Sequence, residues 1–206
     1  MGQEEDVRVI CLCGVEGIGK TVEATVIFER ICLNFECFVF LNEIGEADQV
    51  GILGLQKKLL CNLTKVERWR MNDDIQTDIN KINSNDDIQT NINKINGNDN
   101  IQTNINKINS NMCRRRIFLV LDNVTSKEQI DYFGAGERDL LCCGSRILIT
   151  TRSQNLLKDL DVDDKYIVKG LDQNEALQLF CRHAWKREEP QEGYEELSRS
   201  LAHYAG

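Results

Sequence analysis

The fold of this chain is decided by Gly14-Val15-Glu16-Gly17-Ile18-Gly19-Lys20-Thr21, a stretch near the start of its 206 residues. These residues fit the pattern G-x-x-x-x-G-K-[ST], in which backbone N–H groups surround phosphate oxygens. Lys20 supplies positive charge for the terminal phosphates, and the Thr21 hydroxyl is a ligand for Mg²⁺. We predict that the phosphates of a nucleotide bind along this loop, from Gly14 to Val22.

The segments on either side of the loop provide the setting that this motif requires. Residues 7–13 are apolar and β-branched, which is typical of a buried strand. Residues 22–33 carry apolar side chains at a helical spacing. A strand, a glycine-rich loop and a helix in this order distinguish a phosphate-binding loop from an ordinary glycine-rich turn that binds no ligand.

Further apolar segments follow the pattern of buried strands: residues 35–41, 117–123, 144–152 and 166–168. Between them lie stretches with helical periodicity, of which residues 50–63 are the longest. Strands that alternate with helices favour a parallel sheet. The sequence therefore predicts an α/β fold of the P-loop NTPase type, with a parallel five-stranded sheet flanked by helices.

The last part of the chain is predicted to be helical. Asp172 and Glu175 have the spacing of a capping box at the start of a helix. Pro190 ends that segment, and another helix is expected over residues 193–204. We therefore expect a phosphate-binding domain over residues 1–170, followed by the start of a small helical subdomain over residues 171–206.

Three near-identical units of thirteen residues interrupt the pattern, at residues 72–84, 85–97 and 98–110. Their common text is N-D-[DN]-I-Q-T-[DN]-I-N-K-I-N-[SG]. The isoleucines of one unit fall on a helical stripe, but successive stripes are about 140° out of register, and Asn is a weak helix former. We expect residues 72–111 to be a looped-out insertion, largely disordered or transiently helical. A role as an interaction surface is the alternative.

Two polar side chains follow buried strands and are expected at the same edge of the sheet as the glycine-rich loop. Asp122 is placed to hold a hydrated Mg²⁺ together with the Thr21 hydroxyl, because an acid at the carboxyl end of a central strand faces the loop. Arg152 ends another strand and is placed to reach a γ-phosphate. The alternative for Arg152, a surface residue that begins the next helix, stays open.

Composition narrows the choice of partner and compartment. The net charge of −8 argues against double-stranded nucleic acid as the main partner. Nine cysteines without a C-x-x-C pair favour a reducing compartment. Neither a signal peptide nor an apolar run of membrane-spanning length is apparent. We expect a cytoplasmic or nuclear protein that binds neither nucleic acid nor a membrane.

Four spaced blocks resemble the NB-ARC domain of plant nucleotide-binding leucine-rich-repeat resistance proteins: GVEGIGKT at residues 14–21, LVLDNV at 119–124, GSRILITTR at 144–152 and YIVKGLDQNEALQLFCRHAW at 166–185. Residues 35–44, and the absence of Trp after LVLDNV, are more similar to the class that carries a Toll/interleukin-1-receptor domain. The resemblance implies a switch between ADP and ATP in defence signalling, with self-association or related immune receptors as partners. It makes Asp122 the Walker-B acid, Arg152 the γ-phosphate sensor, and residues 171–206 the start of the ARC1 subdomain.

The chain also departs from the family pattern. Asn123 stands where the family commonly has a second Asp, the group expected to orient or deprotonate water. An amide accepts no proton, so we expect at most a slow ATPase, with Asp122 and Asn123 as the candidate catalytic pair. Val22 replaces a frequent second Thr. The family pattern continues past Gly206, so a truncated fragment is expected.

Two other functions compete with the switch. One is a non-binding adaptor or decoy that contacts full-length relatives. The other is an active P-loop NTPase such as a small kinase or GTPase. The text Asn-Lys-Ile-Asn in each repeat unit resembles a guanine-reading motif, but an amide replaces its carboxylate. The resemblance to the NB-ARC domain implies adenine nucleotides, ADP and ATP, as the ligands.

Overall fold

The structure is a computed structural model that describes residues 6–65 and 100–205. The chain divides into two compact units, residues 1–168 and residues 169–206. The first unit holds two buried clusters of apolar side chains, and the second unit holds one.

The first unit is built on a parallel five-stranded sheet, which confirms the predicted α/β fold. Its strands are β1 Arg8–Cys13, β2 Cys37–Leu41, β3 Ile117–Val124, β4 Arg146–Thr151 and β5 Asp164–Ile167. They lie in the order β2-β3-β4-β1-β5. Strand β1 therefore lies beside β4 and β5, with β4 between β1 and β3. All five carboxyl ends meet at one edge, because every pairing is parallel.

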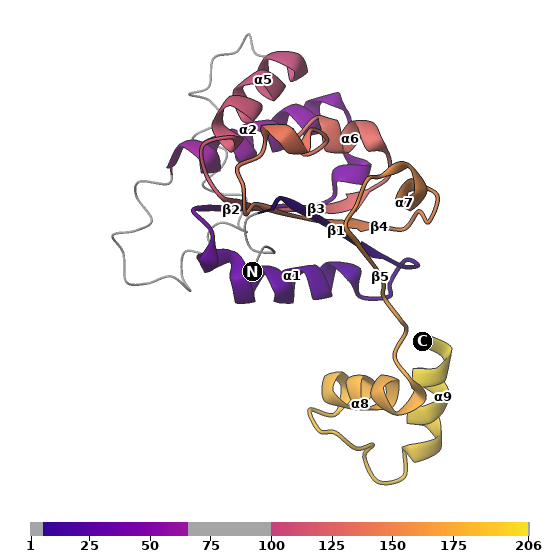
Figure 1. The fold of residues 1–206 in the computed structure, drawn as a ribbon. Helices are drawn as coiled ribbons and strands as arrows, with labels where there is room; N and C mark the ends of the chain where they lie inside the picture. Colours follow the sequence, from indigo (N-terminus) through magenta and orange to yellow (C-terminus); the bar gives the residue numbers. More distant parts are fainter. Residues whose placement is uncertain (1–5, 66–99, 206) are drawn as a thin grey trace. The chain divides into compact units, whose positions relative to one another are not determined.

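Helices cover both faces of this sheet (Figure 1). Helix α1 Lys20–Ile31 lies on one face, and α2 Gln49–Lys65, α5 Ile101–Met112 and α6 Lys127–Asp131 lie on the other. Short elements complete the unit: α7 Leu156–Asp159 and the 3₁₀ turns Cys32–Asn34, Ile44–Glu46 and Arg138–Leu140. Because both faces are covered, the central strands are nearly continuous apolar runs, as sequence periodicity predicted.

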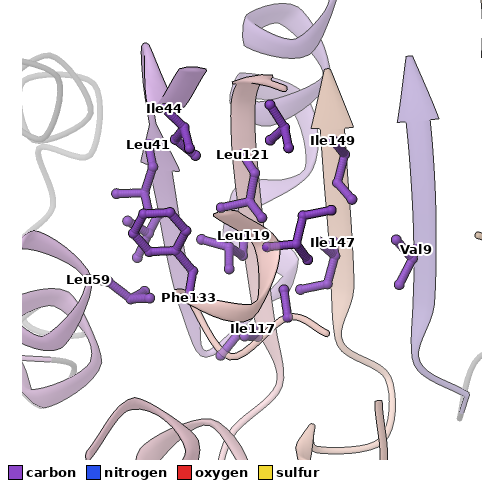
Figure 2. Packing of buried hydrophobic residues seen from close by; sticks show 14 of the residues in the cluster. Val9, Leu41, Ile44, Leu59, Ile117, Leu119, Leu121, Phe133, Ile147 and Ile149 are labelled. Atoms are coloured by element: carbon purple, nitrogen blue, oxygen red, sulfur yellow. The ribbon is translucent and has the colours of Figure 1, made fainter. Parts of the chain in front are cut away.

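Strand β3 shows how alternate residues supply the two cores. Ile117, Leu119 and Leu121 belong to the larger cluster, which includes residues of α2 and α5 (Figure 2). Phe118 and Val120 belong to the smaller cluster on the α1 face. Each fully buried large side chain contributes about 1.5–3 kcal/mol to folding. The sheet is consequently held from both sides, and its carboxyl edge is a firm support for a binding loop.

The second unit consists of α8 Gln173–Ala184 and α9 Glu195–Ala205. Asp172 caps α8 in the predicted manner: its carboxylate accepts hydrogen bonds from the backbone of Asn174 and Glu175, both at 2.8 Å. The Glu175 carboxylate accepts one in return from the Asp172 N–H at 2.9 Å. The two helices share a small cluster of Leu177, Cys181 and Ala202.

One expectation about the repeat is wrong. The third copy, residues 98–110, is not looped out, since most of it forms the packed helix α5. Asn100 caps this helix by accepting a hydrogen bond from the Thr103 N–H at 2.8 Å. Ile108 and Met112 are fully buried against the larger core. Tertiary packing of one helix face thus overrides the weak helix propensity of asparagine. The first two copies lie outside the described residues.

Helix α5 also carries a buried polar contact with α2. Asn104 is fully buried, and its Nδ2 donates to Gln56 Oε1 at 3.3 Å. Gln56 Nε2 in turn donates to the carbonyl oxygens of Ile101, at 3.3 Å, and Tyr132, at 2.8 Å. The Asn104 Oδ1 atom has no hydrogen-bond partner within the described part of the chain. The side chain at position 104 therefore has to donate a hydrogen bond to Gln56 Oε1, and a neutral amide can do so.

The contact predicts a strong effect of one small change. Asn104→Asp places a buried carboxylate against the Gln56 oxygen, which we expect to lower the free energy of unfolding by about 3–5 kcal/mol. Burial disfavours the charged carboxylate, so the loss shrinks as the pH falls and the group becomes protonated. Urea denaturation at two pH values measures both effects. The matched control is Asn106→Asp on the exposed face of α5, expected to change stability by less than about 0.5 kcal/mol. Equal effects of the two changes would contradict the packing described.

Candidate functional site

The glycine-rich loop between β1 and α1 depends on backbone conformations that favour glycine. Gly17 has φ 76° and Gly19 has φ 101°, both in the left-handed region. Gly19 is also the N-cap residue of α1, so the loop leads directly into the positive end of that helix. Gly14 is needed for another reason, because a Cβ there would lie 2.9 Å from Ile18 Cγ2.

Lys20 is buried within this loop rather than extended into solvent. Only 7% of its surface is exposed, and its Nζ donates to the carbonyl oxygen of Val15 at 2.7 Å. Burial lowers the pKa of the Lys20 ammonium, and the nearby Arg152 guanidinium lowers it further. The protein therefore fixes the ammonium at the loop, where a phosphate group would meet it already positioned.

Hydrogen bonds bring the two predicted metal-binding residues together. Thr21 Oγ1 donates to Asp122 Oδ1 at 2.9 Å, although the two residues are 101 positions apart. Thr150 Oγ1, from β4, donates to the same carboxylate oxygen at 2.7 Å. Asp122 itself is 4% exposed. Because both hydroxyls donate to it, the carboxylate is held in place at the edge of the sheet.

These residues line a cavity of about 420 Å³ at the carboxyl edge of the sheet. Its lining comprises Glu16, Gly17, Gly19, Lys20, Thr21, Val22, Asn42, Glu43, Glu46, Asp122, Asn123, Thr150 and Arg152. Nine of these thirteen positions belong to the predicted site. The predicted residues Gly14, Val15 and Ile18 do not line it but support the loop: Val15 through its carbonyl oxygen, and Ile18 by packing against the α1-side core.

Sequence reasoning missed four lining residues: Asn42, Glu43, Glu46 and Thr150. Thr150 is the second-to-last residue of β4. It lies close to Asp122 because β3 and β4 pair in parallel. The other three lie in the segment after β2, which carries no motif. The rule that carboxyl ends of parallel strands share an edge is the signal that places this segment at the site.

Arg152 begins the segment after β4 and pairs with a residue of the glycine-rich loop. Its Nη1 lies 2.8 Å from Glu16 Oε2, and both side chains line the cavity. The Arg152 side chain is 43% exposed and that of Glu16 is 75% exposed. The next helix, α7, begins only at Leu156. The guanidinium therefore belongs to the lining of the site rather than to the start of a helix.

Asn123 follows Asp122 in an uncommon backbone conformation with φ 59°, which Asn adopts more readily than most residues. Its backbone N–H donates to Thr150 Oγ1 at 2.8 Å. Gly45 lies directly against the backbone oxygen of Asn123. The segment after β2 and the end of β3 thereby lie against each other beside the cavity.

The donor set at Thr21 and Asp122 consists of oxygen atoms, which are the ligands that Mg²⁺ prefers. A hydroxyl and a buried carboxylate joined by a 2.9 Å hydrogen bond fit a hydrated ion of this kind. Over residues 6–65 and 100–205, no group of three or more His, Cys, Asp or Glu side chains has the arrangement of a metal site. In the same ranges, none of the helices has the length and apolar character needed to span a membrane.

Comparison with known proteins identifies relatives of the whole chain. The family model described as the NB-ARC domain matches residues 1–190. Disease resistance protein RPV1 of Vitis rotundifolia is 32% identical over 203 residues, which are 98% of this chain and 13% of that protein. TMV resistance protein N of Nicotiana glutinosa is 29% identical over 205 residues, 97% of this chain and 15% of that protein. The chain thus spans a small part of the length of these relatives.

Among solved structures, a signal transduction ATPase with numerous domains and a tetratricopeptide repeat sensor, from Pyrococcus horikoshii, aligns with 95% of this chain and 25% of its own. The TM-score is 0.42 and the sequence identity is 20%.

Replacing glycine by alanine is expected to have opposite effects at Gly45, which lies against the end of β3, and at Gly54, which has open space beside it. In Gly45→Ala, the new Cβ would overlap the Asn123 backbone oxygen and lie 2.8 Å from Thr125 Cγ2. We expect a loss of about 1–3 kcal/mol in unfolding free energy. Gly54→Ala, inside α2, meets nothing within 4 Å and is expected to stabilise by about 0.5–1 kcal/mol. Thermal denaturation of both variants measures the contrast, and a neutral Gly45→Ala would refute the contact.

Proposed function

Because this chain belongs to the NB-ARC domain family, we propose that it is a switch module of plant defence signalling that binds ADP and ATP. One observation carries the proposal: the Thr21 hydroxyl and the Asp122 carboxylate meet beside a buried lysine, in a cavity at the carboxyl edge of a parallel sheet. This is the edge where nucleotides bind in open α/β folds. The names of the relatives, disease resistance proteins, support the assignment to defence.

In this proposal, each part of the lining has one task. The backbone N–H groups of the loop and the α1 N-terminus bind phosphate oxygens, with Lys20 as a point charge. Thr21 and Asp122 hold Mg²⁺, which when bound neutralises phosphate charge. Arg152 meets the terminal phosphate. The hydroxyl of Thr150 keeps the Asp122 carboxylate oriented toward the loop.

Turnover is proposed to be slow or absent. Asn123 stands beside Asp122 in the lining, and its amide cannot take a proton from water. Asp122 Oδ1 already accepts hydrogen bonds from the Thr21 and Thr150 hydroxyls, so this oxygen atom is engaged by protein donors rather than by an attacking water. Binding without rapid hydrolysis is what a switch requires, because a long-lived nucleotide state can then be read by a partner.

The cellular setting is also part of the proposal. All nine cysteines are free thiols, five of them buried, and burial raises the pKa of Cys11 to about 12. Free thiols support a reducing compartment, the cytoplasm or the nucleus. Partners are proposed to be further copies of the chain or related immune receptors. The principal competitor is an adaptor that makes those contacts without binding nucleotide.

Calorimetry with ADP·Mg²⁺ separates the switch from the adaptor. We expect the wild-type chain to bind, and Lys20→Ala to lose about 2–4 kcal/mol of binding free energy, because a charged phosphate contact disappears. ADP at a hundred times its dissociation constant adds about 2.7 kcal/mol of stability, so the melting temperature rises by about 5–10 °C. Lys158→Ala, an exposed lysine on α7, is the control and should bind like wild type. Equal binding by Lys20→Ala would sink the proposed site.

Replacing Asn123 by aspartate tests whether the amide at this position keeps ATP hydrolysis slow. In Asn123→Asp, a carboxylate becomes available next to Asp122, and we expect phosphate release from ATP to rise at least tenfold, since a general base contributes roughly 10²–10⁴ in rate. Aspartate also tolerates the positive φ at this position. Asn42→Asp makes the same change elsewhere in the lining and is expected to leave the rate near that of wild type. A rate that Asn123→Asp does not raise would show that the amide is not what limits hydrolysis.

A further inference from the structure

The glycine-rich loop carries a carboxylate of its own, at Glu16, and this carboxylate is directed to the cation across the cavity. Glu16 Oε2 lies 2.8 Å from Arg152 Nη1, the distance of a charge-assisted hydrogen bond. The two residues come from different segments, the loop after β1 and the segment after β4. The pair therefore links the glycine-rich loop to the segment after β4.

The balance of charges in the cavity lining determines how much this ion pair matters for binding of an anionic ligand. Four carboxylates, those of Glu16, Glu43, Glu46 and Asp122, face two cations, Lys20 and Arg152. The Lys20 ammonium is fixed within the loop by the Val15 carbonyl. Arg152 is therefore the lining cation that remains for a phosphate beyond those held by the loop itself, and Glu16 already neutralises it.

We propose that Glu16 is a specificity-determining residue of the nucleotide site: by holding Arg152, it favours a nucleoside diphosphate over a nucleoside triphosphate. The inference rests on the proposed function. A triphosphate brings one more negative group than a diphosphate, and that group must compete with Glu16 for the guanidinium. It also meets the Glu16 charge at close range. A diphosphate, held by the loop and Lys20, leaves the pair in place.

The expected size of the effect follows from exposure. Both side chains reach solvent, with 43% of Arg152 and 75% of Glu16 exposed, so the pair is screened and is worth little on its own. We expect removal of the Glu16 charge to raise triphosphate affinity by about 1.5- to 5-fold, the range typical of exposed ion pairs. The gain is expected to shrink in high salt.

Calorimetry on the full chain tests the proposal with ADP·Mg²⁺ and a non-hydrolysable ATP analogue with Mg²⁺. Glu16→Gln keeps the size of the side chain and removes its charge. Glu46→Gln removes one charge from the same lining, and the structure gives Glu46 no ion pair among the described residues. Both changes are repeated in an Arg152→Gln background, because a double-mutant cycle isolates the coupling between two residues. Circular dichroism confirms folding, and Glu16→Ala serves as a second variant.

Support requires that Glu16→Gln raise the affinity for the ATP analogue relative to ADP more than Glu46→Gln does, and that this gain disappear in the Arg152→Gln background. An unchanged ratio of the two affinities, or a gain that survives without Arg152, overturns the inference while ADP binding by the wild type upholds the proposed function. Failure of the wild type to bind either nucleotide overturns both.

Discussion

The hydrogen bond from Thr21 to Asp122 is the constraint on which the site depends. Thr21 lies at the start of α1, directly after the loop that follows β1, and Asp122 lies in β3. Strands β1 and β3 are not neighbours, because β4 lies between them. The same carboxylate accepts a hydrogen bond from Thr150 of β4, so one buried oxygen atom joins three segments at the sheet edge. A buried carboxylate is costly unless it is hydrogen-bonded. The sheet therefore fixes both the glycine-rich loop and its acid in one arrangement.

The sequence predicts the fold well where burial is continuous. Strands such as β3 and β4 are covered on both faces, so each is a nearly continuous apolar run in the sequence. The glycine-rich loop is recognisable because Gly17 and Gly19 adopt positive φ angles that favour glycine. The segment after β2 is different, because Gly45 lies against Asn123 and Thr125 at the end of β3. A contact between distant segments leaves no periodicity in either of them. For this reason the sequence does not predict that Asn42, Glu43 and Glu46 line the cavity.

The repeat shows a second limit of periodicity. Its copies are nearly identical in text, so an argument from composition treats them alike. Helix α5 is stabilised by residues outside the copy: Gln56 of α2, and Met112, which follows the third copy and is fully buried. At the positions that correspond to Met112, the first and second copies are followed by Asp86 and Asp99. The apolar residue at this place in the third copy is the sequence feature that accompanies its packed helix.

The internal contacts of the cavity bear on how the proposed switch would work. The groups assigned to phosphate and Mg²⁺ already have partners within the protein: Lys20 with the Val15 carbonyl, Thr21 with Asp122, and Arg152 with Glu16. On the proposed function, a nucleotide exchanges these contacts for its own, so its affinity is a difference between two sets of interactions. These partners also hold the loop in shape, which lowers the cost of ordering it on binding. A ligand shifts a conformational equilibrium only by its differential affinity for the two states. Internal partners that one nucleotide displaces and another leaves in place supply such a difference, and they do so without any chemical step.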